Sequence, residues 1–369
     1  MKQLSTIQLS LTFAGCFLGA GYVSGQELWQ FCGQFGGFGI VGMLCAVGIL
    51  CAFGILLLRL AQKTGLREMD KLVVRRELPW LRALVSLFQG VFLFGVTAIM
   101  AAGASALLHQ LLGIPVWLGS LLFCGLVLLV AIRGLTGIVR SFSLLVPILV
   151  VATVAFGIAA LVKFPLTGAS FVPAKTGGNP LLSNWLLGML TFSAYNAFAT
   201  VGILCPLGEL VPSKRTVLGG VGLGSLFLLA ISSGVLLALL AHPEAAGAEL
   251  PMLALATTLS PALSYVYGLL LLIAMFGTSS SSLVAVLIFL GQKFPAVETH
   301  RKTGAAVLAT AAALGGLLGF GDLISVVYPI FGYLSLLILG CLLSHYLYVC
   351  KTQTSDCAQS IGGETRSFR

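Results

Sequence analysis

Long apolar segments alternate with short polar ones along nearly the whole chain. A helix needs about twenty mostly apolar residues to cross the hydrocarbon core of a bilayer. Ten segments come close to this length: residues 8–31, 36–60, 81–112, 115–132, 141–162, 184–207, 216–241, 260–291, 303–319 and 323–349. The pattern therefore predicts an all-α integral membrane protein with ten transmembrane helices.

The composition agrees with lipid surroundings. Hydrophobic residues make up 58% of the chain and charged residues only 8%, whereas a soluble protein carries about a quarter charged residues. The net charge of +9 would suit nucleic acid if the basic residues gathered on one face, but they lie in short segments between the apolar runs. Nine irregularly spaced cysteines without a CxxC pair indicate neither a disulfide framework nor a zinc site.

The basic residues also predict how the chain is oriented. With a cytoplasmic N-terminus, eighteen of the 20 Lys and Arg residues fall on the cytoplasmic side, and only Lys163 and Lys175 fall outside. This asymmetry follows the positive-inside rule. We therefore expect a multi-pass protein of the cell inner (plasma) membrane with both termini in the cytoplasm.

The two halves of the chain share a pattern of loops. A polar loop of about twenty residues follows the second helix, at 61–80, and one of similar length follows the seventh, at 242–260. Because five spans are an odd number, the second set of five is inverted relative to the first. Chance is the alternative explanation. The pattern predicts one transmembrane domain, 1–350, with repeats at about 8–163 and 184–350, and a short polar cytoplasmic tail at 351–369.

The first predicted helix contains residues that break helices. Glycine lowers the cost of leaving helical geometry, and irregular backbone at membrane depth is tolerated only inside protein or beside water. A break would free N–H groups for an anion and carbonyls for a cation. A packing face of small residues is the alternative, although it does not explain an acidic residue there. The residues concerned are Gly15, Gly19, Gly21, Ser24, Gly25, Gln26 and Glu27.

The sixth and eighth predicted helices carry unusual polar runs. Thr191, Ser193, Tyr195 and Asn196 cannot all face one neighbour in a regular helix, so we expect a local unwinding there, with interhelical hydrogen bonding as the alternative. The run 278–282 is Thr-Ser-Ser-Ser-Ser. Its hydroxyls suit a small cation, although such side chains also bond to their own helix.

Together these motifs resemble those of a known family. Gly-Ala-Gly at 19–21, followed by Ser-Gly-Gln-Glu at 24–27, resembles the YkvI-type amino acid permeases of the amino acid–polyamine–organocation (APC) superfamily. The resemblance implies a LeuT-type fold, a five-plus-five inverted repeat with broken helices one and six. It also implies that the amides of Ala20 and Gly21 hold a substrate carboxylate. A sodium site is implied at the carbonyls of Gly15, Leu18 and Met275 with the hydroxyls of Thr278 and Ser279.

The resemblance extends to the sixth helix, with departures. Tyr195-Asn196, Glu209 and the Pro-Ser-Lys-Arg turn at 212–215 follow the order found in such transporters. Some proton-coupled relatives use a lysine in helix five, which 141–162 lacks. Glu27 then stays a candidate proton carrier. Asn196 stands where an acidic residue is common, which leaves the substrate class open.

These expectations combine into one functional hypothesis. The chain is expected to be a secondary active transporter that carries an amino acid or similar small zwitterion with a cation, sodium favoured over a proton. It needs no other cofactor and no obligate protein partner. The expected substrate-binding residues are Gly19, Ala20, Gly21, Ser24, Ser193, Tyr195 and Asn196, with Glu27 and Glu209 in coupling or gating.

Three other functions are weighed against transport. A ligand sensor with the same fold is the main alternative, although no soluble signalling domain is evident. A membrane serine protease is disfavoured because its base must reach its nucleophile, and the histidines nearest to Ser24, His109 and His345, fall at opposite ends of their helices. A channel is less favoured because broken helices in inverted repeats suit alternating access. We therefore expect no enzyme activity.

Overall fold

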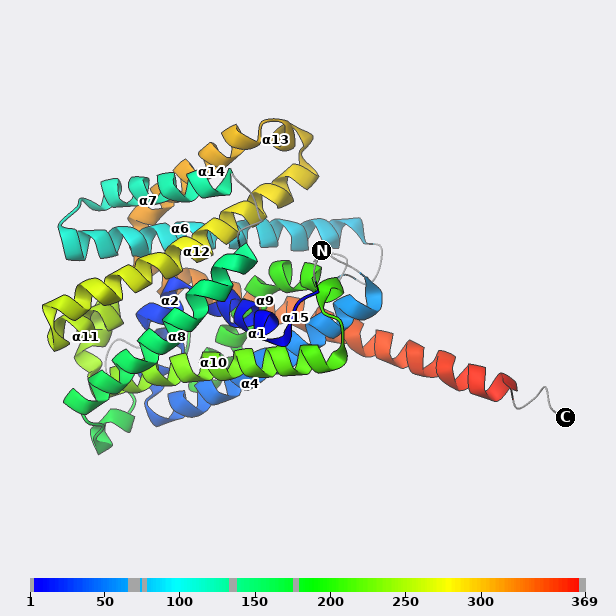
Figure 1. Cartoon of the computed structure of the whole chain (residues 1–369), viewed down its shortest axis with the longest axis horizontal. Coiled ribbons are helices and arrows are strands. Elements are labelled where there is room, and N and C mark those ends of the chain that lie inside the picture. Colours follow the sequence, from blue (N-terminus) through cyan, green and yellow to red (C-terminus); the bar gives the residue numbers. More distant parts are fainter. Residues whose placement is uncertain (1–2, 66–73, 75–77, 133–137, 175–178, 365–369) are drawn as a thin grey trace.

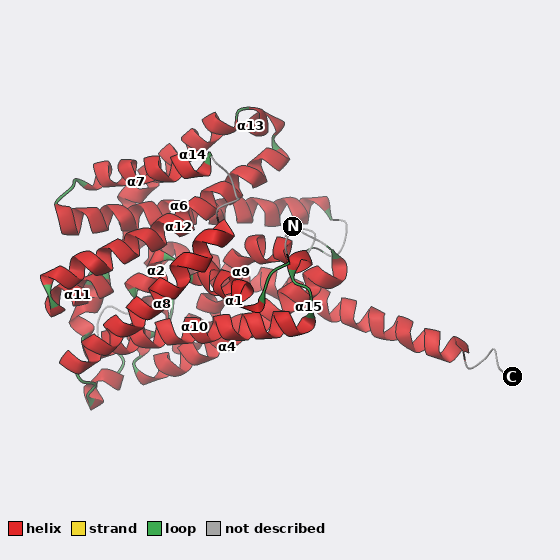
Figure 2. Cartoon of the chain, viewed as in Figure 1, coloured by secondary structure: helices red, strands yellow, loops and turns green. Residues whose placement is uncertain are grey.

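The computed structural model describes residues 3–65, 74, 78–132, 138–174 and 179–364, and its regular structure there is helical (Figure 2). Six described helices are long and apolar enough to cross a membrane, and they pack side by side in one bundle (Figure 1). They are α4 (Gly37–Thr64), α6 (Pro79–Leu112), α8 (Ile138–Lys163), α10 (Lys214–Ala241), α12 (Pro261–Lys293) and α15 (Phe320–Glu364).

The remaining predicted spans are shorter or interrupted helices. Among them, α9 (Trp185–Leu207) continues into η4 (Gly208–Leu210). Its two parts, Trp185–Val201 and Ile203–Leu210, form a bent pair that is together long and apolar enough to be a seventh span. The others are α1 (Thr6–Phe17), α7 (Val116–Ala131) and α14 (Arg301–Gly315), which continues into η6 (Gly316–Leu318). Each of the ten predicted segments thus contains a helix, while the number of ten membrane spans stays a prediction.

Helix packing repeats between the two halves of the chain. The first helix, α1, packs on α10, and its counterpart α9 packs on α4. Likewise α8 contacts α1 and α12, whereas its counterpart α15 contacts α9 and α6. The pairs α4–α10, α6–α12 and α7–α14 join equivalent helices of the two halves. Exchanging the halves therefore reproduces these contacts, as expected for the predicted inverted repeat.

The predicted break in the first helix is present. Helix α1 ends at Phe17, and Leu18 has ψ 63°, outside the helical range. Gly19 is extended, with φ −81° and ψ 175°, before α2 begins at Ala20. The chain thus leaves helical geometry within the glycine-rich motif from which the break was predicted.

A second break follows five residues later, at Gly25. This residue has φ +82°, in the left-handed region that favours glycine. It separates α2 (Ala20–Ser24) from α3 (Gln26–Phe31). An added Cβ would lie 2.7 Å from Leu239 Cδ1 and 3.0 Å from Met252 Cγ. Both the dihedral angle and the close packing therefore require glycine here.

The two long loops differ in how far the structure describes them. The loop after α10 folds into η5 (Pro243–Gly247) and α11 (Pro251–Leu259), and α11 packs against α12, α10 and α2. It therefore covers the predicted outer end of the broken helix. Most of its predicted counterpart, 61–80, lies outside the described residues. So do these basic residues used for orientation: Lys2, Arg67, Lys71, Arg75, Arg76, Arg133, Lys175, Arg366 and Arg369.

The unwinding predicted in the sixth helix is wrong in its position. Thr191, Ser193 and Asn196 lie in regular helix, and each side chain donates to the carbonyl four residues earlier. The polar run satisfies itself within its own helix. The helix instead bends by 51° further on, between Val201 and Ile203.

Replacing Gly25 should destabilise the fold. We expect Gly25→Ala to lower the free energy of unfolding by about 1–3 kcal/mol, because a non-glycine residue in a sparsely populated conformation costs that much. The measurement is denaturant unfolding in detergent micelles. Gly222→Ala is the control, since an added Cβ there meets nothing within 4 Å. Equal stability of the two variants would show that the kink at Gly25 does not require glycine.

Candidate functional site

Helix α2 is held between its neighbours by two tyrosine hydroxyls. The Tyr22 hydroxyl donates to the carbonyl of Leu228 on α10 at 3.2 Å. The Tyr267 hydroxyl on α12 donates to the carbonyl of Val23 at 2.7 Å. Because α2 is only five residues long, the Tyr267 hydroxyl supplies a donor to the Val23 carbonyl that a continuous helix would supply from its own backbone. The Tyr22 hydroxyl instead links α2 to a carbonyl of α10.

The first break frees carbonyls on its α1 side. The N–H of Gly19 donates to Phe17 at 2.7 Å, whereas a continuous helix would direct it to Gly15. Among the described backbone groups, none donates to the carbonyl of Leu18. The Gly19 N–H is thus diverted from the Gly15 carbonyl, while the role of Gly15 and Leu18 as ion ligands stays a prediction.

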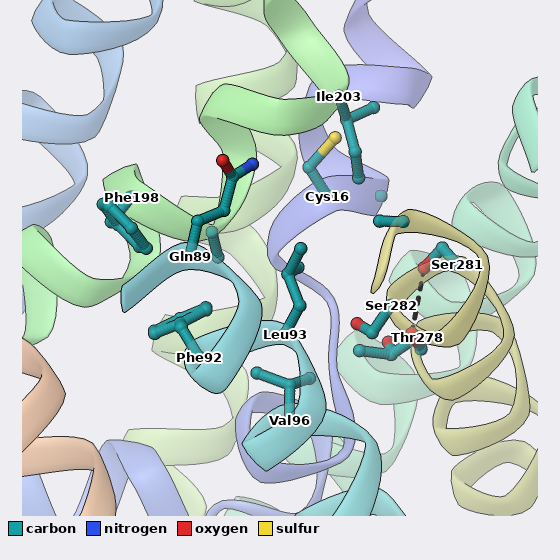
Figure 3. A pocket seen from close by; sticks show the side chains of 13 residues that line it. Cys16, Gln89, Phe92, Leu93, Val96, Phe198, Ile203, Thr278, Ser281 and Ser282 are labelled. Carbon is teal, nitrogen blue, oxygen red and sulfur yellow. Dashed lines mark hydrogen bonds between the residues drawn. The ribbon is translucent and has the colours of Figure 1, made fainter. Parts of the chain in front are cut away.

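Thr278 of α12 lies beside the break. An added Cβ at Gly19 would lie 3.7 Å from Thr278 Oγ1. Gly15 and Thr278 also line one cavity of about 60 Å³, together with Ser281, Ser282 and residues of α6 and α9 (Figure 3). A second cavity is lined by Gly15 and Leu18 with Ala274 and Gly277 of α12. The structure thus brings the predicted carbonyls of the first helix close to the predicted hydroxyl run.

The other two predicted ion ligands are Ser279 and Met275, and no contact between them and the break is described. Ser279 is fully buried, and its hydroxyl has no hydrogen-bond partner. The side chain of Met275 lies close to Gly103 of α6. By contrast, the Ser281 hydroxyl donates to the carbonyls of Gly277 and Thr278. The neighbouring Ser280 hydroxyl is likewise buried without a partner among the described residues, so this feature does not single out Ser279, whose role as an ion ligand stays a prediction.

Glu27 of α3 is the buried acid of the site. Its side chain is 4% exposed, and Tyr195 Oη of α9 donates to Glu27 Oε2 at 2.5 Å. The carboxylate fills the space beside Gly21, where any added Cβ would collide with it. The second break thus folds the acid of α3 back over α2, and Gly21 leaves the room for it.

Five aromatic residues from four helices pack near this carboxylate. We call them the aromatic cluster. The Tyr195 ring lies 4.7 Å from Tyr328, 5.3 Å from Phe31 and 5.8 Å from Phe192, centroid to centroid. The ring of Tyr22 lies 6.1 Å from Phe192. The cluster joins α2, α3, α9 and α15 around the second break.

The remaining predicted site residues are engaged elsewhere. The Ser24 hydroxyl donates to Gly21 and accepts from the Gln26 N–H, both at 3.3 Å, so it supports the kink at Gly25. Ser193 and Asn196 bond within α9 as described above. Glu209 is exposed on η4, whose Leu210 carbonyl accepts from Leu4 near the N-terminus. It is not part of the cluster around Glu27.

Sequence reasoning missed several residues of the site. Gln89 of α6 lines the cavity beside Thr278 (Figure 3), but an isolated glutamine in a long apolar segment gave no signal. Tyr22, Phe31, Phe192 and Tyr328 looked like ordinary apolar positions. Their grouping around one carboxylate depends on which helices pack together.

Comparison with known proteins tests the resemblance. No family model matches the chain. The uncharacterized membrane protein YkvI of Bacillus subtilis (strain 168) is 27% identical over 345 residues, which cover 92% of this chain and 95% of YkvI. The uncharacterized protein YyaD of the same organism is also 27% identical, over 90% of this chain and 94% of YyaD. The chain is a relative of YkvI.

Several solved structures have the same fold as this chain. MhsT in complex with L-phenylalanine aligns with a TM-score of 0.67 at 18% identity, covering 95% of this chain and 92% of MhsT. The inward-facing conformation of Mhp1 also gives 0.67, at 16% identity over 94% of this chain and 77% of Mhp1. A Na⁺-coupled sialic acid symporter gives 0.60 at 16% identity, over 94% of this chain and 78% of that one.

These comparisons confirm the predicted fold class. The chain is an all-α, multi-pass integral membrane protein with the LeuT-type fold of MhsT and Mhp1. The proteins to which it is similar are membrane proteins and transporters, not enzymes, in agreement with the expectation from sequence.

The Tyr195–Glu27 hydrogen bond should contribute measurably to stability. We expect Tyr195→Phe to lower the free energy of unfolding by about 1–3 kcal/mol, because a buried carboxylate oxygen loses its donor. Denaturant titration in detergent micelles measures this. Tyr333→Phe is the control, since its hydroxyl bonds a carbonyl in an exposed position. A double variant with Glu27→Gln should show non-additivity, and strict additivity would mean that the two side chains are uncoupled.

Proposed function

We propose that this chain is a secondary active transporter that carries an amino acid or similar small zwitterion together with a cation, sodium favoured, by alternating access. The observation that carries the proposal is the broken first helix, with freed carbonyls beside a hydroxyl run on one side and a buried carboxylate on the other. Irregular backbone at membrane depth is tolerated where it serves a site within the protein.

The known proteins of this fold support transport of a small molecule. MhsT was solved with L-phenylalanine, and the sialic acid symporter is Na⁺-coupled. Both share the fold at low identity, so they support the class of function and not the particular substrate. The proposed substrate residues of this chain are those around the second break: Gly19, Ala20, Gly21, Ser24 and Tyr195, with Ser193 and Asn196 on α9.

The shape of the pathway supports alternating access. The cavity beside Gly15 and Thr278 has about 60 Å³, whereas small-molecule sites have roughly 300–1,000 Å³. On the predicted outer side, α11 packs over α2. The structure thus corresponds to a nearly closed state. Binding of an amino acid requires the helices around the break to move apart, as alternation between two openings would provide.

The proposed ion site fits sodium in its donor chemistry. Hydroxyl and carbonyl oxygens are hard ligands that suit a small hard cation, and Gly15, Leu18, Met275, Thr278 and Ser279 supply only such oxygens. No group of three His, Cys, Asp or Glu side chains is placed to hold a metal ion among the described residues. Glu27 is the candidate for a proton-linked role, and Glu209 for gating at the inner end of α9.

Uptake experiments test the transport function. We expect purified protein in proteoliposomes to accumulate at least one labelled amino acid when a sodium gradient is imposed, and less when sodium is replaced by choline. A separate proton gradient distinguishes the two coupling ions. Empty liposomes are the control. Absence of uptake for every natural amino acid under both gradients would refute the proposed function.

Variants of α12 test the ion site. We expect Thr278→Ala and Ser279→Ala each to weaken sodium-induced thermal stabilisation by at least about tenfold in apparent affinity, because each removes one ligand oxygen worth about 1.4 kcal/mol or more. Ser279→Ala should not destabilise the protein without sodium, since its hydroxyl is buried and unpaired.

The matched control for these variants is Ser281→Ala. Its hydroxyl already bonds two carbonyls of its own helix, so the sodium response should stay as in the parent protein. Unchanged sodium responses in both Thr278→Ala and Ser279→Ala would remove the ion site from this position.

A further inference from the structure

The Glu27 carboxylate lacks a compensating positive charge. Within the described part of the chain, its hydrogen-bond partner is the neutral Tyr195 hydroxyl, and no lysine, arginine or histidine contributes to its electrostatic surroundings. An acidic group at membrane depth is costly unless it is paired, and unpaired intramembrane acids usually mark a functional site. Either a proton on the carboxyl group or a cation that arrives from outside the chain can balance this charge.

The aromatic cluster determines which kind of partner suits Glu27. The hydroxyl-bearing rings of Tyr22, Tyr195 and Tyr328 all lie within electrostatic range of its charge. Aromatic rings carry negative faces, so groups of them attract cations and form the cages that recognise ammonium groups. A second anion would be repelled by both the carboxylate and the ring faces. The surroundings therefore favour a cationic nitrogen.

The position of Glu27 on the broken helix supports the same choice. Its carboxylate fills the space beside Gly21, one of the two residues whose amides are proposed to hold a substrate carboxylate. Two carboxylates cannot share that space without strong repulsion. The positive end of a zwitterion can pair with Glu27 there, while its carboxylate lies elsewhere on the break.

Further acidic groups lie on the predicted outer side of the cluster. Glu249 and Asp322 are exposed, and an added Cβ at Gly319 would lie 3.4 Å from Glu249 Oε1 and 3.5 Å from Asp322 Oδ2. Next to them, the amide of Gln26 lies against Gly321. Clustered acidic groups at a surface raise the local concentration of cations. An amine approaching from that side therefore meets negative charge before it reaches Glu27.

The geometry points to Glu27 and the aromatic cluster as the binding site for a positively charged nitrogen of the substrate. This inference rests on the proposed function and makes it more specific: the ammonium group of the substrate contributes more to binding than its carboxylate does. Tyr195 acts as a positioning residue because its hydroxyl fixes one carboxylate oxygen. The cluster is closed in this structure, and helix movements between the transport states would admit the ligand.

A binding experiment with matched compounds tests this requirement. Three side chains are each presented as an amino acid, as the amine without the carboxylate, and as the acid without the amine. These are L-phenylalanine, phenethylamine and hydrocinnamate; L-leucine, isoamylamine and isocaproate; and L-alanine, ethylamine and propionate. Binding to the purified full-length protein is measured by thermal stabilisation and calorimetry. We expect at least one amine to bind about tenfold or more tightly than its matched acid.

Variants test whether the Glu27 carboxylate causes the preference for amines over acids. We expect Glu27→Gln to weaken amine binding by at least about tenfold, because removing one partner of a desolvated charge pair is costly. Glu27→Asp, which keeps the charge, should retain part of the preference even if Glu27→Gln folds poorly. Tyr328→Leu should weaken amine binding several-fold through loss of one ring. Glu298→Gln is the control, since Glu298 is exposed on α13 (Pro295–Thr299), outside the cluster.

The outcomes separate this inference from the proposed function. Uptake of amino acids in proteoliposomes, together with acids that bind as tightly as amines, would overturn the inference and leave transport standing. Amine binding that depends on Glu27, without uptake of any compound, would support the inference and refute transport. Amine binding that Glu27→Gln leaves unchanged would overturn it, as would failure of all three amines to bind.

Discussion

The need to satisfy backbone hydrogen bonds inside a bilayer governs the first helix, and the rest of the site depends on how the chain meets it. Ending α1 at Phe17 and starting again at Ala20 leaves carbonyls and amides without helical partners, which lipid cannot supply. The hydroxyls of Tyr22 and Tyr267 tie α2 to α10 and α12. The break is therefore joined to its neighbours by hydrogen bonds, and Gly15 and Leu18 line a cavity together with residues of α12.

The same constraint explains why the acid lies where it does. Gly25 turns the chain through a left-handed conformation, so α3 starts by placing Glu27 over α2 instead of further along one continuous helix. Gly21 provides the space, and Tyr195 of α9 holds one carboxylate oxygen. Two glycines with different tasks thus bring a carboxylate to the part of the helix where backbone groups are exposed. Without either, the acid would have to lie elsewhere.

The sequence predicts the break in helix one because glycine clusters and acids are rare at membrane depth, so local pattern carries the signal. It does not predict the hydrogen-bond partners of Thr191, Ser193 and Asn196. A polar side chain in a helix can bond a carbonyl of its own helix or a group on a neighbouring helix equally well. It also misses Tyr328 and Phe31, which look like core positions until α15 and α3 pack against α9. Packing between helices that are distant in sequence determines where these side chains lie, and no periodicity along the chain indicates that packing.

The proposed ion site and the carboxylate lie near the two ends of the short helix α2, and this proximity gives a physical basis for the proposed coupling. Thr278 contacts the position of Gly19, and Glu27 contacts that of Gly21, only two residues further along the chain. A cation beside the Gly15 and Leu18 carbonyls and a charged nitrogen at Glu27 would act on the same backbone segment. The cation would interact with the carbonyl dipoles and the nitrogen with the Glu27 carboxylate. Because the two sites would be close and the medium has a low dielectric constant, each bound charge would also act on the groups of the other site. If both proposed sites bind their ligands, binding at one side would change the free energy of binding at the other, and by linkage the effect would be reciprocal.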